Sequence, residues 1–158
     1  MYKKILVPLD GSGLSECSLS HVMMVATGCK VPEVVLFRVA EPLSPMVYAG
    51  EMDARWIVQA EEKNKVQAKE YIEEMAVRLK KEGIAVQGVF VSGRAAEEII
   101  DYAKKNQVDL IVMSTHGRSG VSRWAWGSVA DRVLRHSPVP VLMVTSSGCR
   151  TNPSEDTR

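Results

Sequence analysis

Cysteine is scarce in this sequence, and long apolar segments are absent. Only three of its 158 residues are cysteines, at positions 17, 29 and 149. A chain of this length can bury enough surface to fold without disulfides, and sparse cysteine is typical of proteins in a reducing compartment. No segment approaches the roughly 18 apolar residues of a membrane span, and Pro8 and Asp10 interrupt the apolar N-terminal segment before it could act as a signal peptide. We therefore expect a cytoplasmic protein with no membrane partner.

An excess of charge of one sign is also missing. Twenty Lys and Arg residues against 19 Asp and Glu leave a formal net charge of +1. Binding to a phosphate backbone requires a basic surface, so this balance predicts no nucleic-acid partner. The content of 46% hydrophobic and 25% charged residues is that of a globular protein. At roughly 150 residues per domain, we expect one domain over residues 1–146 and a flexible polar tail over 147–158.

Two common nucleotide-binding motifs are missing as well. The sequence contains no G-x-x-x-x-G-K-[ST], which excludes a Walker-type ATPase. Gly11 and Gly13 begin a G-x-G-x-x-G pattern, but Glu16 occupies the third glycine position, where its carboxylate would repel a pyrophosphate. A dinucleotide site is therefore not expected.

Short apolar segments do recur along the chain, and helical patterns separate them. Near-continuous apolar segments rich in β-branched residues are typical of parallel strands covered on both faces. The predicted strands are residues 4–9, 34–40, 84–91, 110–113 and 139–144. The predicted helices lie around 15–27, from about 53 to 81 with Gly83 as its C-cap, around 96–103 and around 130–134. This strict alternation predicts an α/β fold, a doubly wound open five-stranded parallel sheet with helices on both faces.

The segments that follow the strands indicate where a ligand would bind. In open α/β sheets, ligands bind outside the carboxyl ends of the strands, where the strand order reverses. The first strand exits into the segment 10–13, and the fourth exits into 114–120, both of them small and polar. If these two exits line one crevice, their strands are neighbours. The sequence therefore favours the strand order 3-2-1-4-5 over 2-1-3-4-5.

The segment from Ser114 to Ser128 has the parts of a phosphate site. Glycines let the backbone approach an anion, and Ser128 opens a helix whose N-terminal N–H groups favour negative charge. Arg118 and Arg123 could contact phosphate oxygens in a bidentate way. The pattern Ser128-x-x-Asp131 also fits a helix cap. Ser128 could therefore cap its helix, contact phosphate, or do each in turn.

Residues 113–144 resemble the C-terminal signature of the universal stress proteins, whose nucleotide-binding members carry G-2x-G-9x-G-[ST]. Ser114 occupies the first glycine position, Gly117 the second and Gly127-Ser128 the last pair, with nine residues between. The opening KILVPLDGS is similar to the family's first strand and its acidic exit. The resemblance spans residues 3–144, nearly the whole chain.

The resemblance implies a homodimer that binds ATP or AMP. The residues that it places against the adenosine are Pro8, Leu9, Asp10, Val39 (through its backbone) and Met113. Those that it places around the phosphates are Gly117, Arg118, Gly127, Ser128 and Val129. Ser114 and His116, from the same segment, complete the candidate set. Mg²⁺ could bridge the phosphates without a dedicated protein site, since it keeps several waters and takes ligand oxygens.

Three features leave alternatives open. Ser114 adds a Cβ where the family has glycine, and its hydroxyl either obstructs the ligand or donates to a ribose or phosphate oxygen. Trp124 and Trp126 stand where the family has aliphatic residues, and they could pack against the sheet, stack on a partner or cover the nucleotide. The connection 41–52 is long enough for a lid, although mobility without function fits it equally.

Catalysis has weaker support in the sequence than binding. A weak ATP hydrolase would use Ser12 or Ser114 as nucleophile, His116 as base and Asp10 to orient it. The motif G-x-S-x-G, a common setting for such a nucleophile, is absent. One Cys-His pair at helical spacing lacks a second pair. We therefore predict no catalytic residue and no metal site.

The last predicted strand points to self-association. Val139 to Val144 ends the sheet, and an apolar edge strand is prone to pair with another chain. Pro140 lacks an N–H and blocks only part of that edge. We predict a homodimer through this strand, acting as a stress-response sensor or adaptor for an unknown downstream protein. The alternative is a dimerisation module of the same fold that binds no nucleotide.

Overall fold

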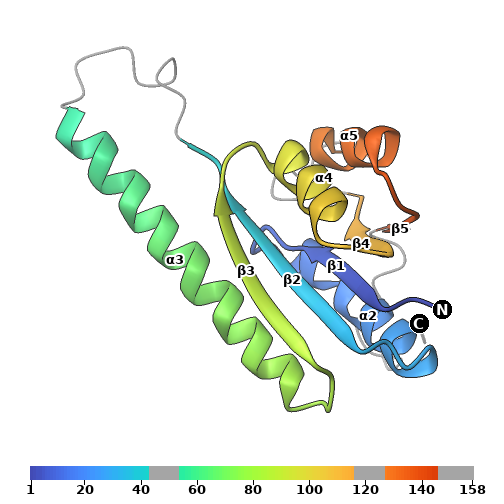
Figure 1. Cartoon of the computed structure of the whole chain (residues 1–158). Coiled ribbons are helices and arrows are strands. Elements are labelled where there is room, and N and C mark those ends of the chain that lie inside the picture. The colour runs from blue at the N-terminus through green and yellow to red at the C-terminus, as the bar shows by residue number, and fades with distance from the viewer. Residues whose placement is uncertain (43–53, 116–126, 146–158) are drawn as a thin grey trace, which may run out of the picture.

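The computed structural model describes residues 1–42, 54–115 and 127–145, in which five parallel strands form one sheet (Figure 1). The strands are β1 (Lys4–Pro8), β2 (Glu33–Ala40), β3 (Val86–Ser92), β4 (Leu110–Ser114) and β5 (Val141–Val144). Their order is β3-β2-β1-β4-β5, with parallel pairing throughout. The predicted fold class and the predicted strand order are confirmed. The last strand begins two residues later than predicted.

Helices cover both faces of this sheet. They are α1 (Gly13–Glu16), α2 (Ser18–Gly28), α3 (Ala54–Lys80), α4 (Ala95–Lys105) and α5 (Ser128–His136). Alternate residues of the central strands point to opposite faces, so Ile5 and Val7 of β1 join the core under α2 and α3, whereas Leu6 joins the core under α4 and α5. Each central strand is therefore apolar on both sides, which explains its continuous apolar sequence.

The predicted first helix is two helices in the structure, with a break at Cys17. Serine hydroxyls compete here for the carbonyls that a continuous helix would use. Ser15 Oγ donates to the carbonyl of Ser12 at 2.8 Å, and Ser18 Oγ donates to the carbonyl of Ser15 at 2.7 Å. Ser12 Oγ also caps α1 by accepting from the Ser15 N–H at 3.1 Å. The serines after β1 thus build a short turn of helix before α2 begins.

The long helix α3 packs closely on β3 and continues past the end of the sheet (Figure 1). Gly88 of β3 permits this approach, since a Cβ there would lie 3.1 Å from the carbonyl oxygen of Ile72. The helix ends near its predicted position. Gly83 follows it with φ +84°, and its N–H donates to the carbonyl of Lys80 at 3.1 Å. No helix within the described ranges is long and apolar enough to cross a membrane.

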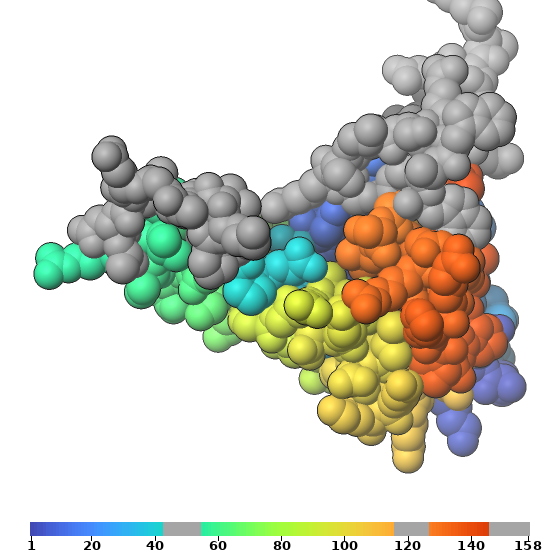
Figure 2. Space-filling model, turned by 90° about the horizontal axis from the view of Figure 1, so that it is seen from above, coloured from blue at the N-terminus to red at the C-terminus, as the bar shows by residue number. Residues whose placement is uncertain are grey.

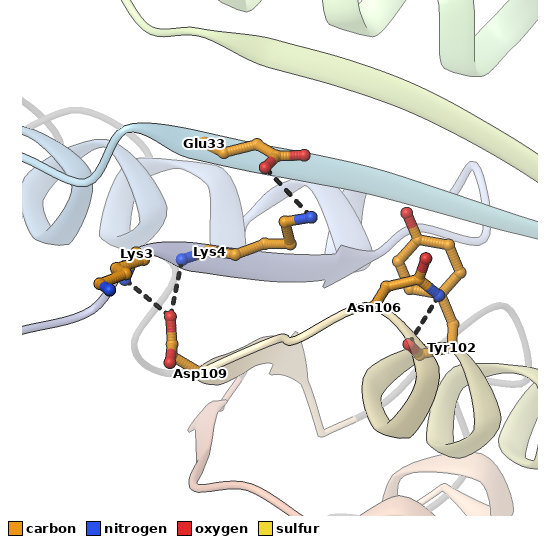
Figure 3. A network of polar contacts seen from close by, with 6 residues as sticks. All are labelled: Lys3, Lys4, Glu33, Tyr102, Asn106 and Asp109. Carbon is orange, nitrogen blue, oxygen red and sulfur yellow. Dashed lines mark hydrogen bonds and ion pairs between the residues drawn. The ribbon is translucent and has the colours of Figure 1, made fainter.

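The amino ends of β1 and β4 are joined by Asp109 (Figure 3). Its Oδ2 accepts from the backbone N–H groups of Lys3 and Lys4, at 2.7 and 2.9 Å. Lys4 Nζ lies 3.1 Å from Glu33 Oε2, which adds β2 to the same cluster. The two backbone hydrogen bonds lower the pKa of Asp109 below its usual range. This cluster lies at the end of the sheet opposite to the strand exits.

Candidate functional site

A cavity of about 580 Å³ lies at the carboxyl ends of β1, β2 and β4. The segments after β1, β2 and β4 line it together with the N-terminal ends of α4 and α5 and the middle of α3. In Figure 2 the blue N-terminal residues lie between the cyan end of β2 and the orange residues around α5. Because β1 and β4 are neighbours, their two polar exits share this one cavity, as the sequence predicted.

The candidate residues within the described ranges all line this cavity. They are Pro8, Leu9, Asp10, Val39, Met113, Ser114, Gly127, Ser128 and Val129. The remaining candidates, His116, Gly117 and Arg118, lie outside the described residues, as do Arg123, Trp124, Trp126, most of the segment 41–52 and the segment 147–158. The nucleotide contacts of the whole set remain predictions.

The turn after β1 holds Asp10 in a fixed position. Its Oδ1 accepts from the Ser12 N–H at 2.9 Å and from Ser12 Oγ at 2.6 Å. The Asp10 N–H in turn donates to Ser15 Oγ at 3.3 Å. The carboxylate is therefore oriented at the cavity wall before any ligand arrives. A carboxylate only accepts hydrogen bonds, so this wall suits hydroxyl groups and disfavours phosphate.

The end of β2 offers two backbone groups to the cavity. The chain of β1 makes its last backbone hydrogen bond to β2 from the Leu9 N–H to the Phe37 carbonyl, at 2.9 Å, and then turns away from β2. Backbone groups of alternate residues point to the same side of a strand, so Val39 faces the side that β1 has left. The Gly93 N–H donates to the Ala40 carbonyl at 3.1 Å, as expected if Ala40 faces β3 instead. The N–H and C=O of Val39 thus form a donor and an acceptor at the cavity wall.

Gly127 and the first residues of α5 form another wall. The Gly127 N–H donates to the Thr115 carbonyl at 2.9 Å, which ties the start of α5 to the exit of β4. Gly127 is the N-cap, with an extended conformation, and Ser128 is the first residue of the helix. The hypothesis that Ser128 caps the helix is therefore wrong, because the capping position falls one residue earlier. The early N–H groups of α5 have no partner within their own helix, and they favour an anion in the cavity.

Ser114 has an ordinary strand conformation, so its backbone does not require glycine. It ends β4, where it pairs with Val144 of β5, and its side chain is half-buried at the cavity wall. Its backbone is not in the left-handed region that would demand glycine. A Cβ is therefore compatible with the local backbone at this position.

The structure adds a wall that the sequence interpretation missed. Asn64, Gln67, Ala68 and Tyr71 of α3 line the cavity opposite the ends of α4 and α5. Their spacing of three, one and three residues places them on one face of the helix. The sequence did contain a signal for this wall, because Asn64 and Gln67 are uncharged residues in a highly charged segment and continue the helix face that carries the buried residues of α3.

Tyr71 connects this wall to the turn after β1. Its hydroxyl donates to Glu16 Oε1 at 3.0 Å, and Arg78 Nη1 lies 4.0 Å from Glu16 Oε2. Burial, and next the nearby carboxylate of Glu16, raise the pKa of Tyr71 well above its usual value. Tyr71 therefore stays protonated and remains a hydrogen-bond donor. Within the described part of the chain, no three His, Cys, Asp or Glu side chains gather to hold a metal ion.

Comparison with known proteins gives consistent matches over the whole fold. The family model described as the universal stress protein family matches residues 1–145. Universal stress protein MJ0577 of Methanocaldococcus jannaschii is 34% identical over 155 residues, which cover 91% of this chain and 95% of that protein. MJ0531 of the same organism is 31% identical over 144 residues, which cover 91% and 82%. The solved structure of MJ0577 has a TM-score of 0.80 at 32% identity and covers 92% of this chain and 96% of its own.

Two more distant structures share the fold alone. A universal stress protein solved in complex with cAMP has a TM-score of 0.65 at 23% identity, covering 90% of this chain and 97% of its own. A family protein from Arabidopsis thaliana, solved with AMP bound, has a TM-score of 0.59 at 15% identity, covering 98% and 99%.

Proposed function

Because the chain belongs to the universal stress protein family, we propose that it binds an adenine nucleotide, ATP or AMP, in the cavity at the strand exits. The observation that carries this proposal is the meeting of three complementary groups in one cavity. These are the backbone pair of Val39, the fixed carboxylate of Asp10 and the N-terminal end of α5. Family proteins solved with AMP and with cAMP support the choice of an adenine nucleotide.

Each group suits one part of the ligand. The Val39 N–H can donate to a ring nitrogen of adenine, and its C=O can accept from the exocyclic amine. The Asp10 carboxylate can accept from ribose hydroxyls, and its charge keeps the phosphates away from that wall. The phosphates then fit the N–H groups at Gly127, Ser128 and Val129. Mg²⁺ would be held by phosphate oxygens and water, since it commonly takes few protein ligands.

We further propose that binding, and not turnover, is the function. Ser12 Oγ donates to Asp10 and caps α1, so this hydroxyl serves the turn instead of acting as a nucleophile. A protein that only binds would act as a stress-response sensor or adaptor, with occupancy of the cavity read by a downstream protein. Phosphate release measured at saturating ATP tests this claim, and turnover that disappears in Asp10→Asn or His116→Ala would contradict it.

A matched pair of substitutions at Gly127 tests nucleotide binding. Gly127→Asp introduces a good N-cap residue but adds a negative charge at the proposed phosphate site, whereas Gly127→Asn adds a similar side chain without charge. Ligand at 100 times its dissociation constant should stabilise the native protein by about 2.7 kcal/mol. We expect ATP and AMP to raise the melting temperature of the wild-type and Asn proteins, and the Asp protein to lose most of this shift.

Two results of this experiment would contradict the proposal. No shift of the wild-type protein at millimolar nucleotide would favour the alternative, a dimerisation module that binds no nucleotide. An equal shift in the Asp and Asn proteins would show that the phosphates do not lie at the start of α5.

The edge of the sheet supports a homodimer. β5 is the terminal strand beside β4, and Leu142 at its centre is 38% exposed. An exposed edge strand with apolar side chains favours pairing with the same strand of a second copy around a two-fold axis. We propose that β5 mediates this contact.

A further inference from the structure

We infer that Glu41 makes the cavity selective for a purine with an amino group at its six-position over one with a carbonyl there. The inference rests on the proposed function, because it assigns the base preference of that same cavity. Glu41 belongs to no motif that the sequence interpretation used, and it lies in the described part of the chain directly after β2.

Glu41 lines the same cavity as Val39, two residues further along the chain. Residues two apart on an extended chain present their side chains to the same face. Val39 packs on the core beneath α4 and α5, and the side chain of Glu41 likewise reaches α4. Glu41, Val39 and Ala95 all line the same cavity.

One carboxylate oxygen of Glu41 is held by the protein. Glu41 Oε1 accepts from the Ala95 N–H, the first of α4, at 3.0 Å. Arg94 occupies the N-cap position and carries no side-chain acceptor, so Glu41 supplies the cap from another segment. The positive end of the helix dipole also attracts an acceptor oxygen to this place. The carboxylate is thus oriented at the wall instead of moving freely in solvent.

An oriented carboxylate discriminates by hydrogen-bond polarity. The amino group of adenine has two hydrogens, of which the Val39 carbonyl can take one and Glu41 the other. Guanine and hypoxanthine carry a carbonyl oxygen at this position, which would face two acceptors and no donor. Glu41 is an exposed side chain, but an acceptor that faces two acceptors without a donor still loses a hydrogen bond that adenine makes. The segment after β2 would therefore read the base with one backbone acceptor and one side-chain acceptor.

Glu41→Gln separates this role from the capping role. The amide oxygen of Gln can still accept from the Ala95 N–H, while the adjacent NH₂ group becomes a donor. The cap is kept, and the polarity toward the base is reversed. A residue that only caps α4 would change the affinities for AMP and IMP by the same factor, whereas a residue that reads the base would change their ratio.

The experiment measures dissociation constants for AMP and IMP by isothermal titration calorimetry. We expect the wild-type protein to prefer AMP and Glu41→Gln to reduce the ratio of the two constants by about tenfold or more, since hydrogen bonds to charged groups are among the strong ones. Glu98→Gln is the matched control, because Glu98 lies in the first turn of the same helix but does not line the cavity. It should leave the ratio unchanged.

The outcomes distinguish the two proposals. If the wild-type protein binds AMP and the ratio stays the same in Glu41→Gln, the role of Glu41 is wrong while the proposed function stands. A loss of both affinities by the same factor in Glu41→Gln would also contradict the role of Glu41 in reading the base. If the wild-type protein binds neither nucleotide, the proposed function fails and the base preference fails with it.

Discussion

Asp109 shows how a single side chain stabilises the end of the sheet opposite to the cavity. It bonds to the backbone of Lys3 and Lys4, and its own N–H donates to the Lys4 carbonyl at 2.9 Å. A carboxyl whose pKa is lowered by folding adds stability above its ordinary pKa, and that stability is lost as the pH falls through the lowered value. The contribution of Asp109 should therefore disappear in acid.

Asp109→Asn tests this dependence. We expect the variant to be less stable than the wild-type protein at pH 7, and the difference to shrink below about pH 4, where the Asp109 carboxyl of the unfolded wild-type chain begins to be protonated. Urea unfolding at pH 7, 5 and 3 measures it. Asp101→Asn serves as the control, because Asp101 makes only an exposed ion pair with Lys105 at 3.7 Å. A difference that stays constant with pH would contradict the assignment.

The helices α1 and α3 are far apart in the sequence, but a hydrogen bond joins them beside the cavity. The hydrogen bond from Tyr71 to Glu16 joins the middle of α3 to the turn that orients Asp10. The Glu16 end of this bond depends on the local fold, since serine hydrogen bonds supplement the backbone hydrogen bonds of the short helix α1. The position of the α3 wall is therefore coupled to the exit of β1.

A double-mutant cycle measures this coupling. We expect Tyr71→Phe and Glu16→Ala, alone and combined, to give an interaction energy of about 1 kcal/mol in urea unfolding, because the bond is half-buried and has a charged acceptor. The corresponding cycle with Arg78→Ala should give less than about 0.5 kcal/mol, since Arg78 Nη1 lies 4.0 Å from Glu16 Oε2 and the Arg78 side chain is 68% exposed. Equal values in the two cycles would show that the hydroxyl contributes nothing specific.

The elements also show what the sequence could predict. Apolar periodicity over residues 68–79 identified α3, and the predicted bounds of about 53 and 81 lie within one residue of the observed ones. The break at Cys17 was not predictable from periodicity, since it depends on serine hydroxyls bonding to nearby carbonyls. The α3 wall was missed because the spacing of Asn64 and Gln67 gives their helix face but not the neighbour that this face meets.

At the scale of the whole molecule, the strand order was predictable from the two strand exits. Small polar residues after β1 and β4 were sufficient, because a shared crevice requires neighbouring strands. The capping alternative for Ser128 was wrong, since a capping pattern in sequence does not fix the residue at which the helix begins, and its contact with phosphate stays a prediction. The sequence did not indicate that Glu41 lines the cavity, because its hydrogen bond to α4 joins residues 54 positions apart.

The proposed dimer is a property of the whole molecule and has its own test. Leu142→Lys would place a charge in the contact between two β5 strands, and we expect it to weaken dimerisation by about tenfold or more. Analytical ultracentrifugation over a concentration series measures this change. Val77→Lys is the control, because Val77 lies on α3 and is 54% exposed. A wild-type protein that sediments as a monomer would contradict the homodimer.

The departure of β1 from the sheet at Leu9 has a consequence for how this protein can evolve. The proposed recognition of the base through the peptide groups of Val39 does not depend on the side chain at that position, so many aliphatic replacements there would preserve it. The proposed base preference would then depend on where β1 ends while β2 continues. A mutational scan should show that substitutions of Val39 preserve nucleotide binding. An insertion or deletion that changes the length of β1 should abolish the proposed recognition of the base.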